Sequence, residues 1–154
     1  MAMADRADPE ARRRELEELV FGLGERLRAE RASLFCVDET RDTFRIEVAR
    51  PEGGLELDAH IPMLRGIVGH AWFTGKPVHV GDAYGDPRFC ADVDRASGFR
   101  TRSVLAVPIY GGSDDVVAVL ELLNHREGAG FTDADVEEVR ASVPELLRLL
   151  DAAA

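Results

Sequence analysis

Cysteine is scarce in this chain of 154 residues, which contains only Cys36 and Cys90. Two cysteines do not make the disulfide framework of a small secreted domain, and the simplest interpretation of each is a small buried apolar side chain. The four histidines show neither i,i+4 pairing nor a cysteine at ligand spacing. We therefore expect no metal site.

Long hydrophobic runs and an excess of positive charge are also missing. No apolar stretch approaches the roughly 18–20 residues of a membrane helix, and residues 1–10 lack the apolar core of a secretory signal. The net charge of −10 disfavours binding to nucleic acid or to an anionic membrane. We expect a cytoplasmic protein, in which a helix N-terminus could still hold one small anion.

The rest of the composition is typical of one globular domain. Hydrophobic residues make up 45% of the chain and charged residues 31%, and the length is sufficient for a buried core. We predict a flexible tail over residues 1–8, a single domain over residues 9–151 and a short tail over residues 152–154.

A helix is predicted close to the N-terminus. Asp8 can cap it, and Pro9 suits its first position. Its apolar residues recur on one helical face: Leu16, Leu19, Val20, Leu23 and Leu27. Gly22 and Gly24 either weaken this helix by roughly 1 kcal/mol each relative to alanine or mark a close helix–helix approach.

The C-terminal region is predicted to be helical as well. Thr132 and Asp135 have the spacing of a capping box at its start. Pro144 predicts a kink or a division into two helices.

Between these helices, apolar runs and alternating patterns predict strands. They cover residues 31–38, 43–49, 55–61, 78–80, 104–110 and 116–123. A short helix is expected over residues 64–75, ended by Gly75. This order of elements predicts an α+β fold with one antiparallel sheet and the terminal helices on one face.

The long connection from Asp82 to Ser103 is too polar and too broken for a strand. Connections of this length are usually binding loops, lids or disordered segments. Apolar anchors within it argue against disorder: Tyr84, Phe89, Val93 and Phe99. We interpret it as a lid over a site on the sheet, with one or two helical turns near residues 87–96.

Glu121 is a carboxylate inside an otherwise apolar strand, on the alternating face of Val117, Val119 and Leu123. Either this face is exposed near the strand end, or Glu121 reaches into a pocket and accepts hydrogen bonds from a ligand, because a buried carboxylate needs donors.

The lid carries three closely spaced polar residues, which either cap turns or line the pocket: Asp94, Ser97 and Thr101. No nucleophile with a base, no acid/base carboxylate pair and no phosphate loop is apparent. We therefore expect no enzyme activity.

Several motifs together resemble those of GAF domains, in particular the cyclic-nucleotide-binding type of phosphodiesterases and some bacterial adenylyl cyclases. They are residues 31–35 (RASLF), 66–70 (GIVGH), 82–89 (DAYGDPRF), 97–103 (SGFRTRS) and 120–124 (LELLN). The resemblance covers most of the chain, from Leu16 to Leu147. It implies a six-stranded antiparallel sheet with a ligand enclosed on one face beneath a lid.

The resemblance also implies ligand-binding residues. Ser33 and Glu121 are expected to touch a purine from the sheet, while Ile67 and Val68 offer backbone N–H groups to a cyclic phosphate. The expected lid contacts are Asp94, Ser97 and Thr101.

A family signature of asparagine–lysine, phenylalanine and aspartate–glutamate is partly present. Asn124, Phe131 and Asp135 match it, whereas His125 replaces the lysine and Val136 the glutamate. In the family this set is a structural bridge that is sometimes linked to cyclic-nucleotide binding, so the departures concern the ligand more than the fold.

The resemblance implies a non-enzymatic small-molecule sensor, with cyclic AMP or cyclic GMP as the first-choice ligand and no required cofactor. Lid closure would be passed to the terminal helices, which we expect to pair in a homodimer. One alternative is a ligand-free dimerisation module. Another is a GAF-type free methionine sulfoxide reductase, which needs cysteines clustered at the pocket, where only Cys90 is expected.

Overall fold

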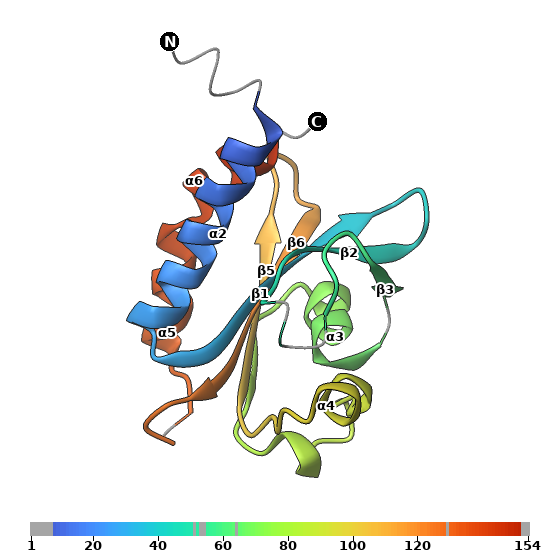
Figure 1. Ribbon diagram of the computed structural model, residues 1–154, viewed down its shortest axis with the longest axis vertical. Helices are drawn as coiled ribbons and strands as arrows, with labels where there is room; N and C mark the ends of the chain where they lie inside the picture. Colours follow the sequence, from blue (N-terminus) through green and yellow to red (C-terminus); the bar gives the residue numbers. More distant parts are fainter. Residues whose placement is uncertain (1–7, 51, 53–54, 64, 129, 152–154) are drawn as a thin grey trace.

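One antiparallel sheet organises the chain in the computed structural model, which describes residues 8–50, 52, 55–63, 65–128 and 130–151 (Figure 1). The elements follow one another as α2 (Pro9–Arg26), β1 (Ala29–Asp38), β2 (Thr43–Val48), β3 (His60–Pro62), α3 (Gly66–Thr74), β4 (Val78–Val80), the 3-10 turn η2 (Ala83–Gly85), α4 (Asp92–Ser97), β5 (Val104–Tyr110), β6 (Val116–His125), α5 (Asp133–Ala141) and α6 (Val143–Asp151).

The six strands lie in the order β3-β2-β1-β6-β5-β4, and each neighbouring pair is antiparallel. The first long strand, β1, and the last, β6, lie side by side at the centre, and their register places Ser33 opposite Glu121. The predicted α+β fold with a six-stranded antiparallel sheet is confirmed.

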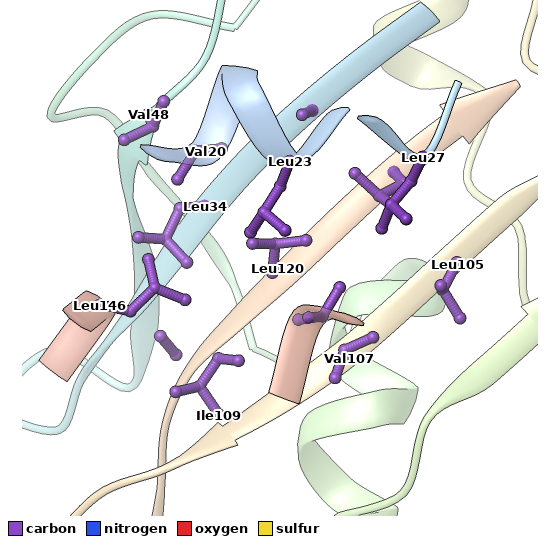
Figure 2. Close-up of a cluster of buried hydrophobic side chains, with 14 of the residues drawn as sticks. Val20, Leu23, Leu27, Leu34, Val48, Leu105, Val107, Ile109, Leu120 and Leu146 are labelled. Atoms are coloured by element: carbon purple, nitrogen blue, oxygen red, sulfur yellow. The ribbon is translucent and has the colours of Figure 1, made fainter. Parts of the chain in front are cut away.

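Helices α2, α5 and α6 cover one face of the sheet (Figure 1). Figure 2 shows Val20 and Leu23 of α2 meeting Leu34 and Leu120 of the central strands, with Leu146 of α6 beside them. All five are fully buried. The apolar stripe predicted for the first helix therefore faces the sheet.

Gly24 of α2 marks a close approach, although not to another helix. A Cβ atom at this position would lie 3.0 Å from the Cβ atom of Ala32 on β1. The glycine thus lets the helix backbone come close to the central sheet, which compensates for its low helix propensity.

The opposite face carries a second apolar core beneath α3 and the lid. Phe44 of β2 lies at its centre, with its ring centroid 6.4 Å from that of Trp72 on α3. Because both faces of the sheet are covered, β5 and β6 have nearly continuous apolar sequences rather than a strict alternation.

The predicted helix boundaries are observed at both ends. The side chain of Asp8 accepts a hydrogen bond from the N–H of Glu10, so the last residue of the predicted tail caps α2. Thr132 and Asp135 form the capping box of α5, and the chain divides into α5 and α6 just before Pro144. Residues 1–7 and 152–154 of the predicted tails lie outside the described residues.

The prediction of a strand over residues 55–61 was wrong in extent, because β3 contains only His60–Pro62. Asp58 has a φ angle of 65° in a turn, and this left-handed conformation interrupts an extended strand. Residues 51, 53 and 54 of the predicted loop before it, and Leu64 of the predicted short helix, lie outside the described residues.

Two further boundaries differ from the sequence prediction. The lid helix begins at Asp92 and ends at Ser97, later than the predicted turns. Val117 packs with the core beneath the terminal helices, not on the face of Val119, because the register shifts by one residue where β5 ends. This β-bulge breaks the alternation from which its face was predicted.

Asn124 anchors the return of the lid to the sheet. This fully buried residue has a φ angle of 58°. Its Oδ1 atom accepts hydrogen bonds from the N–H groups of Arg102 and Ser103, and its Nδ2 atom donates to the carbonyl of Arg100 at 2.9 Å. One side chain thus satisfies three backbone groups where the lid enters β5.

We predict that Asn124→Ala lowers the free energy of unfolding by roughly 2–4 kcal/mol, since it removes three hydrogen bonds and since alanine tolerates the left-handed region less well than asparagine does. Urea denaturation measures this. Asn124→Gly is the matched control, because it removes the same bonds without backbone strain and should cost about 1 kcal/mol less than alanine. Equal losses would show that φ strain contributes nothing here.

Candidate functional site

A cavity of about 250 Å³ lies on the face of the sheet opposite the terminal helices. Its floor is formed by central strands, through Ser33 and Phe35 of β1 and Glu121 and Leu123 of β6. The first turn of α3 forms one wall, and the lid segment around α4 closes another. The predicted lid therefore lies over an actual cavity.

Six of the seven predicted ligand-binding residues line this cavity: Ser33, Ile67, Val68, Asp94, Thr101 and Glu121. Ser97 is absent from the lining. Its Oγ atom donates to the carbonyl of Val93 at 2.9 Å and accepts from the N–H of Phe99 at 3.2 Å, which closes the end of α4. The geometry gives Ser97 the turn-capping role that the sequence had left open.

Asp94 is buried, and both its oxygens are engaged within the lid. One oxygen accepts from the hydroxyl of Tyr84 and from the N–H of Thr101, each at 2.7 Å. The other accepts from the hydroxyl of Thr101 at 2.8 Å. These bonds tie η2, α4 and the lid return together, so Asp94 and Thr101 hold the lid in shape at the edge of the cavity.

The first turn of α3 presents backbone donors to the cavity. Gly66 has a φ angle of 72°, and Ile67 and Val68 follow it in the helix. The N-cap position is Arg65, whose side chain makes no capping hydrogen bond. The N–H groups of a first helical turn have no partner within the helix, and they carry a partial positive charge. This end of the cavity therefore suits an anion.

Glu121 places a carboxyl group on the floor of the cavity, in contrast to the N–H groups at the start of α3. It is half-buried in a central strand beneath the lid, so the surface that it retains faces the cavity. Loss of solvent raises its pKa to about 7, and the negative charge of Asp94 contributes to the same shift. Among the described residues, no group donates a hydrogen bond to this carboxylate.

Three arginines also line the cavity, and the sequence analysis gave none of them a role in it: Arg31, Arg50 and Arg65. The guanidinium carbon of Arg31 lies 4.8 Å from the ring centroid of Phe99 in the lid. Arg65 forms an ion pair with Asp92 at the start of α4. The arginines belong to separate segments of the chain, and no local pattern indicates that folding gathers them.

The two thiols lie on different faces of the sheet. Cys90 lines the cavity. Cys36 is buried in the core beneath the terminal helices, where desolvation and, to a lesser degree, the charge of Glu47 raise its pKa to about 12. Of the two cysteines, Cys90 alone lines the cavity among the described residues.

Within the described part of the chain, no group of three or more metal-ligating side chains comes together. In the same residues, no helix has the length and apolar character needed to cross a membrane.

The chain belongs to the GAF domain family, whose pattern matches residues 12–143. A segment of 62 residues, 40% of the chain, is 48% identical to the dual 3′,5′-cyclic-AMP and -GMP phosphodiesterase 11A of Takifugu rubripes. This match spans only 7% of that protein's length.

Solved structures extend the likeness over the whole chain. The GAF domain of a phosphoenolpyruvate-protein phosphotransferase from Coxiella burnetii matches with a TM-score of 0.73 and 19% identity, covering 99% of this chain and 86% of that one. The free methionine-R-sulfoxide reductase from Neisseria meningitidis matches with a TM-score of 0.72 and 23% identity, covering 97% and 83%. At these identities the likeness concerns the fold.

We predict a pH-dependent effect of Glu121→Gln on stability. The unfolded chain loses the Glu121 proton near pH 4.5, whereas the folded protein keeps it until about pH 7. The contribution of Glu121 to stability is therefore fully present below the lower value and is lost as the pH rises through the upper one. Glutamine has no proton to lose, so the variant should gain roughly 1–3 kcal/mol relative to the natural protein above neutral pH.

Urea denaturation over this pH range measures the difference. Glu56→Gln is the control, because Glu56 is exposed on the turn before β3 and its replacement should give a small, pH-independent difference. A flat difference for Glu121→Gln as well would contradict the raised pKa.

Proposed function

We propose that this GAF domain is a non-enzymatic sensor whose ligand is a cyclic purine nucleotide. The observation that carries the proposal is the carboxylate of Glu121, which faces the cavity without a donor from the described residues. A carboxylate that is partly removed from solvent has lost some of its hydration, so a ligand that supplies donors is favoured. The likeness of one segment to a phosphodiesterase of cyclic AMP and cyclic GMP supports this ligand class.

The two ends of the cavity suit the two ends of such a ligand. A purine edge carries N–H donors for Glu121 and lies within reach of Ser33, the neighbour of Glu121 on β1. A cyclic phosphate carries one negative charge, which the N–H groups of Ile67 and Val68 at the start of α3 would stabilise. The nearby Arg65 adds positive charge at that end.

Two contacts join helix α2 to the segment between β2 and β3, and residues of this segment contribute to the wall of the cavity. Arg50 lines the cavity, and its guanidinium carbon lies 4.1 Å from the ring centroid of Phe21 on α2. Arg13 of α2 donates to Asp58 at 3.1 Å, in the turn before β3. We infer that ligand binding and lid closure reach the terminal helices through this segment, and that those helices pair in a homodimer.

The proposal predicts that cyclic AMP or cyclic GMP binds to ligand-free protein. A nucleotide present at about 100 times its Kd should stabilise the fold by about 2.7 kcal/mol, which thermal unfolding and calorimetry measure. Glu121→Ala should weaken binding by roughly 1–3 kcal/mol through loss of the base contact. Glu56→Ala is the surface control. The absence of stabilisation by either nucleotide would favour another small ligand or a ligand-free dimerisation module.

If the signal passes from the cavity to α2 through Arg50, the Arg50→Met variant should still bind nucleotide but should no longer transmit binding to α2. Methionine keeps an apolar stem against Phe21 but removes the guanidinium group that lies over its ring. With bound nucleotide, hydrogen exchange should slow in the lid of the variant as in the natural protein, whereas the change in α2 should be lost. Arg41→Met, on the exposed turn between β1 and β2, is the control. Sedimentation velocity of the same samples measures whether the protein is a dimer. A monomeric protein would contradict the proposal that the signal is passed on by pairing of the terminal helices.

A further inference from the structure

The environment of Glu121 leaves its protonation to be decided by the ligand and the pH. Its two strand neighbours are Ser33 on β1 and Ala106 on β5, both with short side chains. Ala106 has no polar side-chain atom, and no hydrogen bond from Ser33 contributes to the state of the Glu121 carboxyl group. Neither neighbour therefore fixes the carboxyl group as an anion or as an acid.

Other charged or titratable groups line the same cavity from every element around it. They are Arg31 on β1, Arg50 after β2, Arg65 before α3, and Cys90, Asp92 and Asp94 in the lid. The arginines interact elsewhere, with Phe99, Phe21 and Asp92 respectively. Of the whole set, Asp94 is the charge that acts on Glu121, and it disfavours a second anion.

We propose that Glu121 determines which purine the cavity accepts, the carboxylate selecting guanine and the carboxylic acid accepting either base. This inference rests on the proposed function, because it assumes a cyclic purine nucleotide with its base toward the floor. It adds a specificity-determining residue whose preference changes with pH.

The reason lies in the donors and acceptors of the two bases. The Watson–Crick edge of guanine presents two neighbouring donors, N1–H and the N2 amino group, and a carboxylate has two oxygens that accept both. Adenine presents the N6 amino donor beside the N1 acceptor. A carboxylate repels the lone pair of adenine N1. A carboxylic acid has one donor and one acceptor, so it pairs with N1 and the amino group of adenine or with O6 and N1–H of guanine.

Burial makes both forms of Glu121 available near neutrality, since its pKa is raised to about 7. Neither nucleotide gains or loses a proton close to that pH, so a change in base preference would come from the protein. His70 lines a neighbouring hollow that shares Arg65 and Cys90 with the cavity. It must therefore be separated from Glu121 by experiment.

The test is the ratio of the dissociation constants for cyclic AMP and cyclic GMP, measured by calorimetry on the full chain at about pH 6 and about pH 8. We expect the preference to move toward cyclic GMP by at least about tenfold at the higher pH, the discrimination that one bidentate base contact provides. Both measurements use the natural protein, so the result does not depend on a variant folding.

Glu121→Gln gives the second measurement. The glutamine amide presents a donor beside an acceptor at every pH and can pair with either base, so the variant should bind the two nucleotides with a ratio that does not change with pH. His70→Gln should keep the pH-dependent change of the natural protein. A change that disappears in His70→Gln and persists in Glu121→Gln would assign the switch to the histidine and overturn the inference.

The outcomes distinguish this inference from the proposed function. Binding of either nucleotide with a pH-independent ratio would overturn the role of Glu121 and leave the sensor intact. The absence of binding at both pH values would overturn the sensor and the inference with it. A change of preference toward cyclic AMP at the higher pH would contradict the assignment of the two forms.

Discussion

The pairing of β1 with β6 is the contact on which the rest of the molecule depends. It joins segments from opposite ends of the chain at the centre of the sheet and places Ser33 beside Glu121. One face of this pair receives the terminal helices, and the other becomes the floor of the cavity. The same register therefore determines both the main core and the polar centre of the site.

The lid is held mainly by its own polar side chains. Asp94 binds Tyr84 and both donors of Thr101, while Asn124 binds the lid return from the end of β6. These bonds satisfy buried polar groups that would otherwise be costly. A polar residue beside a cavity is thus not necessarily free for a ligand, and Glu121 stands apart because the described residues give it no donor.

Opposite charges are separated within the cavity. The start of α3 and the arginines lie around its edge, and the carboxylate of Glu121 lies on its floor. A ligand with an anionic end and a donor-bearing end complements this arrangement better than a uniformly charged or purely apolar one. Structural relatives with the same fold include the GAF domain of a phosphotransferase and a reductase, so the lining residues must decide the ligand.

The sequence by itself determined the elements whose signals are local. The caps at Asp8 and Thr132, the break before Pro144 and the apolar stripe of α2 follow from neighbouring residues, as does the oddity of one carboxylate in an apolar strand. The alternation of polar and apolar residues gave a wrong face for Val117 and a wrong extent for β3. A β-bulge at Val117 and the left-handed conformation of Asp58 interrupt the two strands, and the neighbouring residues do not indicate either interruption.

Only the tertiary structure decided which distant residues share the cavity. It brought Arg31, Arg50 and Arg65 to one site and placed Cys36 on the other face of the sheet. It also assigned Ser97 to the end of a helix. The pKa of Glu121 is also set by the tertiary structure, since it depends on burial and on Asp94, which lies on another element. Burial and charge proximity arise from packing between segments that are far apart in sequence, and no window along the chain contains them.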